Sequence, residues 1–254
     1  MNWQDMSYME IKTINLKFTN CFLIPIESKY LLIDTGYEYE WQDFTDGLEK
    51  NNVQINDIKY LLLTHHHDDH AGLLNNITEI NPDITIIASK LTKEYLAQGK
   101  HVNFPGAGYI NKRIAFVLKL KSIFDKNWTH TFPKFIMRSN DILIENDCDL
   151  KNFNINLNGK ILLTPGHSRD SISLLLDNGC CFTGDATGNF LQFLGSKYCV
   201  ISVNDLDEYY NSWDKIIDNK ALIIYPAHGN KFTVDKLIKY LRKNKKKNMV
   251  VWKQ

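Results

Sequence analysis

Leu63-Thr64-His65-His66-His67-Asp68-Asp69-His70-Ala71-Gly72 follows directly after the apolar run Tyr60-Leu61-Leu62. Four candidate metal ligands lie within six residues, in the order His65, His67, Asp69 and His70. Imidazole nitrogen and carboxylate oxygen suit zinc and neighbouring divalent metals. A strand that ends in a ligand-rich loop is a common way to hold a metal at a rigid sheet edge. The stretch therefore predicts a metal site rather than a solvated histidine cluster.

Three further segments repeat this arrangement, in which an apolar run is followed by a potential ligand. Residues 160–163 lead to His167, residues 180–183 lead to Asp185, and residues 221–225 lead to His228. Gly or Pro punctuates each of the three turns, as expected where a strand ends. One loop cannot close a metal site by itself. Four strand ends that carry ligands form a constellation, which is much stronger than any single motif.

Together these segments resemble the metallo-β-lactamase superfamily, in its dinuclear metal hydrolase branch. The matching stretches are residues 64–72, Pro165-Gly166-His167, Gly184-Asp185 and Pro226-Ala227-His228-Gly229, preceded by a strand and turn at 32–36. Matching elements run from about Ile11 to His228. The resemblance implies an α/β fold, the αββα sandwich, with a metal site at one edge. It is specific for the fold and the site, and it says little about the substrate.

The resemblance also implies two divalent metal ions. The ligands of the first ion would be His65, His67 and His167. Those of the second would be Asp69, His70 and His228, and Asp185 would bridge the two ions. Zn²⁺ is the expected metal, with iron and manganese as alternatives because they tolerate the same ligands.

Two metal ions roughly 3.5–4 Å apart can share a water molecule and lower its pKa towards about 7. The hydroxide that forms can attack a carbonyl or phosphoryl centre while the metals stabilise the developing oxyanion. Asp69 is also placed to orient the nucleophile or to pass a proton to the leaving group. The expected catalytic residues are therefore Asp69 and Asp185.

Several branches of the superfamily fit the sequence poorly. Flavodiiron-type oxygen reductases have an acid at the position of His67, and zinc β-lactamases proper lack the Asp at position 185. Glyoxalase-II-like thioesterases carry a helical domain after the last ligand histidine, and ribonuclease-Z-like enzymes carry a larger RNA-binding arm. Lactonases place a tyrosine shortly after the bridging Asp, whereas residues 186–190 contain none. What remains resembles small dinuclear hydrolases.

We therefore expect an enzyme that hydrolyses a carboxylic ester, lactone or thioester with an apolar portion. The alternatives are a phosphodiesterase that uses the same two metals and a metal-containing sensor or binding protein with little turnover. An iron-dependent oxidoreductase is a further class, and it would differ by holding one iron with fewer of these ligands.

Some polar residues near the motifs have open roles. Asp34 follows the apolar run at 30–33, so it either orients a ligand histidine or bonds the backbone of its own turn. Asp68 is expected beside the metals or the substrate without acting as a ligand. His66 alternates with the ligands and is expected to point away from them. For His101 and His130, a substrate contact and an ordinary satisfied histidine both remain open.

Residues 98–140 lengthen the path between His70 and His167 beyond the minimal pattern. They are rich in apolar side chains, such as Phe116, Trp128 and Phe132, and a helix is predicted over 113–124. We expect one domain over residues 1–254, with this mainly helical insertion before the third ligand segment. An insertion beside a site is well placed to be a lid or an apolar wall. A homodimer surface and extra core are the alternatives.

Periodicity and capping signals predict the remaining elements. Strands are expected at 11–26 (paired), 29–33, 58–63 and 84–88, with a hairpin at 171–182 that turns at 177–179. Helices are expected around Trp41 to Leu48, from Ala71, over 91–96, from Asp205 to Ile217, and in the basic stretch 236–247.

The composition sets broad limits on function. The chain has 254 residues and a formal net charge of +1, so no global field favours nucleic acid. The basic stretch at 236–247 is interpreted as a solvated helix end. Five cysteines without a Cys-x-x-Cys pair do not demand an oxidising compartment. The first residues show no signal-peptide pattern, and no apolar stretch is long enough for a membrane. A cytoplasmic enzyme acting on a small molecule is the expectation.

Overall fold

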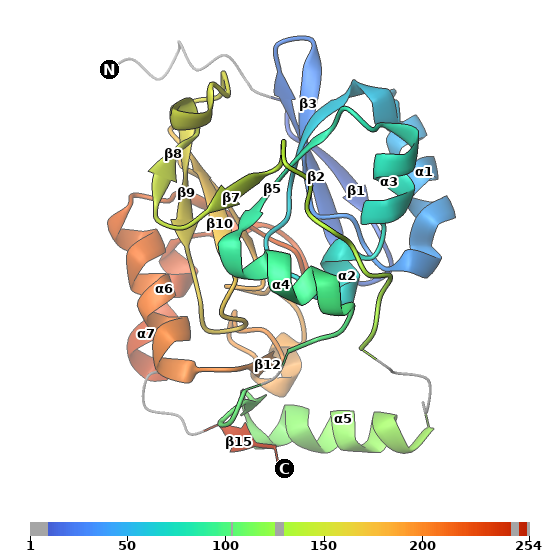
Figure 1. Cartoon of the computed structure of the whole chain (residues 1–254). Helices are drawn as coiled ribbons and strands as arrows, with labels where there is room; N and C mark the ends of the chain where they lie inside the picture. Colours follow the sequence, from blue (N-terminus) through green and yellow to red (C-terminus); the bar gives the residue numbers. More distant parts are fainter. Residues whose placement is uncertain (1–9, 103, 125–129, 245–248, 253–254) are drawn as a thin grey trace.

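The computed structural model describes residues 10–102, 104–124, 130–244 and 249–252. Within these residues, two mixed six-stranded sheets lie face to face, and helices cover both outer faces (Figure 1). This layering confirms the predicted αββα sandwich. A strand in either sheet packs against the other sheet on one face and against helices on the opposite face. Both faces are therefore covered, which explains the nearly continuous apolar runs in the sequence.

The first sheet contains, in spatial order, β1 (Lys12–Asn15), β2 (Asn20–Ile26), β3 (Lys29–Ile33), β4 (Ile58–Leu62), β5 (Thr85–Ser89) and β7 (Ile142–Ile144). The second contains β14 (Phe232–Thr233), β13 (Ile223–Pro226), β11 (Cys180–Gly184), β10 (Ile172–Leu176), β9 (Gly159–Leu163) and β8 (Cys148–Asp149). A small third sheet joins β12 (Ser202–Val203), β6 (Gly108–Tyr109) and β15 (Val250–Val251).

The helices are α1 (Trp41–Lys50), α2 (Asp68–Ala71), α3 (Leu74–Ile80), α4 (Lys90–Gln98), α5 (Lys112–Phe124), α6 (Leu206–Asp218) and α7 (Asp235–Asn244). Helices α1 and α3 cover the first sheet, and α6 and α7 cover the second (Figure 1). The side chain of Asp205 caps α6 by accepting a hydrogen bond from the Glu208 backbone N–H, as predicted.

Three hydrophobic clusters separate the four layers. One lies between the first sheet and its helices, one between the two sheets, and one between the second sheet and its helices. Successive strand residues alternate between clusters: Leu31 and Ile33 of β3 face the second sheet, whereas Leu32 faces the helices. On β9, Ile161 and Leu162 divide in the same way. Because successive side chains of a strand point to opposite faces, each of these apolar strands contributes to two hydrophobic clusters.

Two predicted helices differ in detail from the structure. The short helix expected from Ala71 begins at Asp68, so two of the candidate ligands lie on a helical turn. Acidic side chains at Asp68 and Asp69 stabilise that helix start, because the first turn carries a partial positive charge. The basic helix runs to Asn244, and the rest of its predicted span lies outside the described residues.

The insertion at 98–140 contains helix α5, close to the predicted span, together with strand β6. Ile114 and Leu118 of α5 pack into the cluster beneath the second sheet, whereas Phe132 and Phe135 pack into the cluster of the first sheet. Trp128 lies outside the described residues. Part of the insertion is thus additional core: its middle packs against the second half of the sandwich and its C-terminal part against the first.

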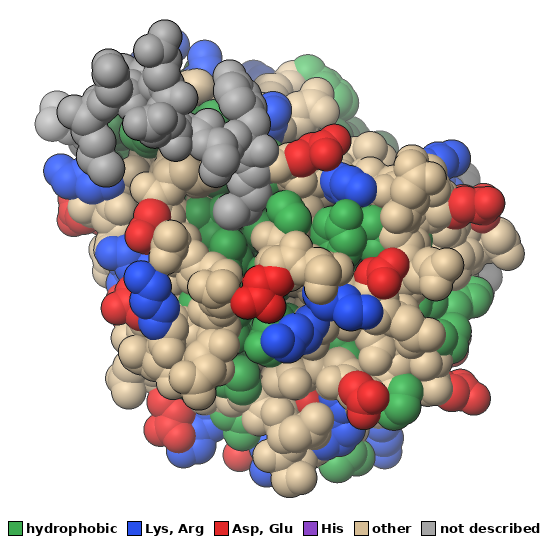
Figure 2. Space-filling view, turned by 90° about the horizontal axis from the view of Figure 1, so that it is seen from above, with side chains coloured by type: hydrophobic (Ala, Val, Ile, Leu, Met, Phe, Trp, Pro, Cys, Tyr) green, Lys and Arg blue, Asp and Glu red, His purple; other side chains and the backbone are tan. Residues whose placement is uncertain are grey.

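The outer surface carries charges of both signs. The face in Figure 2 shows Lys and Arg side chains interspersed with Asp and Glu, in keeping with a net charge of +1. No helix in the described part of the chain combines the length and the apolar character needed to cross a membrane.

Replacing Phe182 with Ala should lower the free energy of unfolding by about 3–5 kcal/mol, because it leaves a cavity between the sheets. The Phe182 ring is fully buried and lies 4.8 Å from Tyr225 and 5.3 Å from Phe22, between ring centroids. The matched control is Phe193→Ala, whose side chain is 78% exposed and should change stability by less than about 0.5 kcal/mol. Urea unfolding of both variants measures the difference, and equal stabilities would contradict this account.

Candidate metal centre

The histidine-rich loop begins where β4 ends. Residues 65–67 are neither helix nor strand, and their side chains alternate: His65 and His67 lie in the ligand clusters, whereas His66 points to Asp170. His67 is the N-cap of α2, and the helical turn that follows carries Asp69 and His70 back to the same side as His65. One short segment thereby presents four potential ligands, two from the loop and two from the helical turn.

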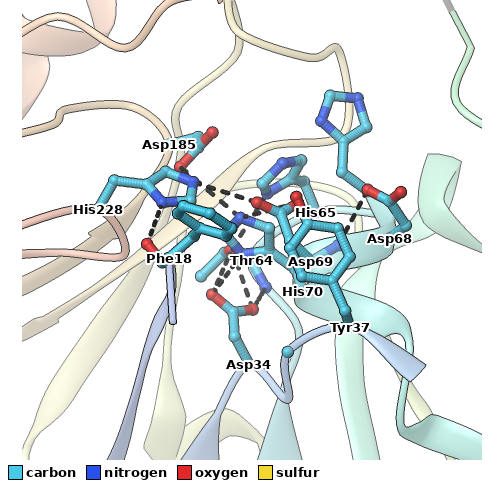
Figure 3. Close-up of polar contacts among 12 residues, drawn as sticks. Phe18, Asp34, Tyr37, Thr64, His65, Asp68, Asp69, His70, Asp185 and His228 are labelled. Atoms are coloured by element: carbon cyan, nitrogen blue, oxygen red, sulfur yellow. Dashed lines mark hydrogen bonds and ion pairs between the residues drawn. The ribbon is translucent and has the colours of Figure 1, made fainter. Parts of the chain in front are cut away.

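Atoms from the four strand ends meet at one place. Figure 3 shows the contributions of His65, Asp69, His70, Asp185 and His228. Three sets of potential ligand atoms each lie within 4.8 Å of one another: His65, His67 and His167; His65, His70 and Asp185; and Asp69, His70 and His228. The structure therefore brings together all seven of the residues that the sequence proposes as ligands. Asp185 occupies the middle, with carboxylate oxygens 3.3 Å from His167 Nε2 and 3.2 Å from His228 Nε2.

Three of the imidazoles are held in place through Nδ1, so that Nε2 faces the centre. His70 Nδ1 lies 2.8 Å from Asp34 Oδ2, and His167 Nδ1 lies 2.8 Å from the Ser202 carbonyl. His228 Nδ1 lies 2.8 Å from the Phe18 carbonyl. An acceptor on one ring nitrogen sets the tautomer and leaves the lone pair of the other nitrogen available, which is how metal-binding histidines are oriented.

Several atoms that face the centre are buried without a hydrogen-bond partner in the described residues. They are Nε2 of His65, Nε2 of His70 and Oδ1 of Asp185, whose close contacts are the ion pairs with His228 and His70. An unpaired buried polar atom costs about 1–3 kcal/mol, so three around one point call for a common partner. Nitrogen and carboxylate oxygen together suit a divalent metal ion, and the residues present fit that group.

The protonation of the histidines agrees with such a role. Burial, reinforced by neighbouring histidines, lowers the pKa of His65 and His67, which keeps them in the neutral form that binds metals. Burial also lowers the pKa of His70, but Asp34 and Asp69 outweigh it and raise that pKa to about 9. The negative charge that holds this proton is equally suited to hold a cation.

Burial alone would raise the pKa of both central carboxyl groups. For Asp185, the charges of His228 and His167 outweigh burial and hold its pKa below the usual value. For Asp69, His70 and His228 act in the same direction. Both groups are therefore ionised carboxylates, the form that coordinates a metal.

Asp34 orients His70, one of the candidate ligands, and does not merely bond its own turn. Besides His70, its carboxylate accepts hydrogen bonds from the N–H of Thr64 at 2.8 Å and from the Thr64 hydroxyl at 2.8 and 3.0 Å. Gly184 lies against the same threonine, where a Cβ atom would collide with the Thr64 side chain. Sequence reasoning missed Thr64; its position directly before the first ligand was the available signal.

A buried network on the far side of the loop was also missed. His66 Nδ1 lies 2.9 Å from Asp170 Oδ1, and the His66 backbone N–H donates to Asp170 Oδ2 at 3.0 Å. The Thr92 hydroxyl donates to the same carboxylate, and His66 Nε2 accepts from the Val102 N–H at 3.1 Å. The network ties the metal loop to the loop of His167 and to the start of the insertion. Only the nearness of Asp170 to His167 pointed to it.

The remaining polar residues of uncertain role lie next to the loop. His101 Nε2 is 2.8 Å from Asp68 Oδ1, and the His101 ring stacks on His67 with centroids 3.9 Å apart. The ring of His130 lies 4.7 Å from that of His101. Neither His101 nor His130 belongs to the three ligand clusters of the centre; both are grouped with Asp68 instead.

The model of the metallo-beta-lactamase superfamily matches residues 14–228, most of the chain. The chain belongs to this superfamily of metal-dependent hydrolases. Among solved structures, an archaeal superfamily protein from Sulfolobus tokodaii aligns with a TM-score of 0.62 and 19% identity, over 92% of this chain and 85% of that one. A subclass B3 metallo-beta-lactamase of Bradyrhizobium japonicum aligns with a TM-score of 0.63 and 18% identity, over 92% and 88%. At such identities the likeness shows the shared fold.

Curated relatives include lactamase-like protein adaB of Aspergillus niger, 28% identical over 86% of this chain and 52% of that protein. Beta-lactamase-like protein 2 homolog of Drosophila melanogaster is 28% identical over 85% and 60%. Thioesterase pkgB of Emericella nidulans is 26% identical over 86% and 48%. The chain thus spans about half the length of the curated relatives that it matches.

Replacing Asp170 with Ala should lower the free energy of unfolding by about 3–5 kcal/mol, because it leaves the His66 ring and backbone N–H and the Thr92 hydroxyl buried without their acceptor. Asp83→Ala, at an exposed acid, is the control and should stay within about 0.5 kcal/mol of wild type. Urea denaturation at neutral pH compares the two. A D170A protein as stable as its control would show that this network does not hold the loop.

Proposed function

We propose that the protein is a hydrolase with two divalent metal ions, in the order of preference Zn²⁺, then Fe or Mn. His65, His67 and His167 would hold one ion, Asp69, His70 and His228 the other, and Asp185 would contact both. The observation that carries this proposal is the convergence of seven ligand atoms from four strand ends, several of them buried and unpartnered. Such atoms are costly unless a shared cation pairs with them.

When bound, the ions would supply Lewis acidity that activates water and polarises the bond to be cleaved. The protein's own groups then set the geometry. Nδ1 contacts at Asp34, Ser202 and Phe18 hold three imidazoles rigidly, so the ligand set is organised before substrate arrives. The Asp69 side chain is 13% exposed, so it is within reach of substrate and can pass a proton to the leaving group.

The substrate that we propose is a carboxylic ester, lactone or thioester with an apolar portion. Aromatic side chains stand on two sides of the centre: Tyr37 beside Asp69, and Phe18 beside His228 (Figure 3). The Phe190 ring lies 5.3 Å from that of His228, and Phe18 is half exposed. Such a rim favours apolar groups next to the reacting carbonyl. A thioesterase among the relatives supports the same substrate class.

Zinc-loaded protein should hydrolyse a medium-chain acyl thioester or lactone faster than an activated phosphodiester. Asp185→Asn should lower that turnover at least about 100-fold, since it weakens the contact shared by both ions. The measurement is the initial rate on all three substrates, with metal content determined in parallel. Faster phosphodiester cleavage would assign the protein to the phosphodiesterases. Two bound metals with no turnover on any substrate would favour a binding role.

Asp34→Asn should weaken the binding of one of the two ions by about 10–100-fold, because His70 loses a charged partner. Asparagine also tolerates the left-handed backbone of this position (φ 59°), so the fold should be retained. Competition with a chelator of known affinity measures the change. Asp177→Asn, at an exposed turn, is the control. Equal affinities in the two variants would remove Asp34 from the support of the centre.

A further inference from the structure

The two ends of the insertion pair with each other next to the metal loop. Lys100 and Thr131 form an antiparallel bridge, and the His101 N–H donates to the His130 carbonyl at 3.0 Å. The Phe132 N–H donates to the Gly99 carbonyl at 3.0 Å. This pairing brings His101 and His130 side by side, although 28 residues separate them in the chain. We call these paired segments, residues 99–101 and 130–132, the stem of the insertion.

The stem places both histidines against Asp68 of the metal loop. One ligand atom from each of Asp68, His101 and His130 lies within 4.8 Å of the other two. His101 Nε2 is 2.8 Å from Asp68 Oδ1. The two imidazole rings lie 4.7 Å apart, with an interplanar angle of 41°. Three potential ligands from two distant parts of the chain thus meet outside the seven-residue centre.

The contacts of this cluster resemble those of the main centre. There, His167 Nε2 lies 2.9 Å from His67 Nδ1 and 3.3 Å from Asp185 Oδ2. In the stem cluster, His101 Nε2 meets an acceptor, the Asp68 carboxylate, and also a donor, the Asp68 backbone N–H at 3.0 Å. Neither tautomer of His101 satisfies both contacts, since one needs a proton on Nε2 and the other needs a lone pair. A cation would use the Nε2 lone pair and the carboxylate together.

We propose that Asp68, His101 and His130 form a further divalent-metal site, which fastens the stem of the insertion to the metal loop. Two imidazoles and one carboxylate suit Zn²⁺, and also Mn²⁺ or Fe²⁺. Three protein ligands leave a coordination position for water or an anionic group. With three protein ligands, against the seven grouped at the main centre, this ion should be the more weakly held.

The ligand sets of the two sites are separate. Asp68 belongs to the stem cluster, whereas the neighbouring Asp69 points to His228, whose Nε2 lies 3.2 Å from Asp69 Oδ2. Adjacent residues at the start of α2 therefore serve opposite sides. The stem site can be removed by substitutions at His101 and His130 that leave every proposed ligand of the main centre in place.

The test is a comparison of metal content. Wild type and the double variant His101→Ala/His130→Ala are freed of metal with a chelator and then equilibrated with buffered Zn²⁺. Bound metal is measured by elemental analysis along the titration. Wild type should saturate with one more ion per chain than the double variant, and that ion should be the first lost on dilution of Zn²⁺. Lys100→Ala, next to His101, is the control and should match wild type.

Because the His101 ring stacks on His67, the single variant His130→Ala is measured beside the double variant; it leaves that stack in place and should lose the same ion. Equal metal content in wild type and double variant would overturn the proposal and leave Asp68 and His101 as a hydrogen-bonded pair. If the double variant fails to fold, as judged by circular dichroism, Asp68→Asn replaces it, because asparagine keeps the shape and removes the charge. D68N should then lose the same ion, and a wild-type metal content would overturn the proposal.

Discussion

The buried Asp34 carboxylate joins three parts of the site. It follows the last residue of β3, accepts two kinds of hydrogen bond from Thr64 at the end of β4, and lies 2.8 Å from Nδ1 of His70 on α2. An anion at this depth is tolerated only when its oxygens are paired, and here the N–H, the hydroxyl and the imidazole provide the pairs. The position of His70, and of the loop on either side of it, depends on this group.

The same logic extends to the second sheet. Gly184 allows the end of β11 to approach Thr64 closely, and Asp185 then reaches the atoms presented by the loop. His167 and His228 arrive from β9 and β13, each held by a backbone carbonyl of another segment. The centre is therefore not the property of one motif. It exists where the ends of strands from both sheets meet. The three hydrophobic clusters fix the position of those sheets and of their helices relative to one another.

The short motifs at the strand ends indicated a metal site, and the family resemblance that they carry implied the layered fold and the set of seven proposed ligands. Apolar strand runs end in Gly, Pro and ligand residues, and the alternation of His65, His66 and His67 sorts inward from outward side chains. Apart from Asp34, the groups that hold the loop and the candidate ligands could not be predicted from the sequence. Asp170, which holds His66, and the carbonyls of Ser202 and Phe18 act through the tertiary fold, and a backbone carbonyl has no sequence signature. The pairing of His101 with His130 likewise depends on how the insertion returns to its starting point.

The insertion is connected to the site because its two ends pair next to the metal loop. Its first residues are tied to His66 by the Val102 N–H, and His66 is tied to Asp170 beside the His167 loop. On the opposite side of the loop, His101 meets Asp68 and stacks on His67. A displacement of the stem would therefore reach the loop through two contacts, the hydrogen bond from the Val102 N–H to His66 and the stacking of His101 on His67. The stem is one connection between the insertion and the candidate centre, and the pairing of Tyr109 with Ser202, whose carbonyl contacts His167 Nδ1, is another.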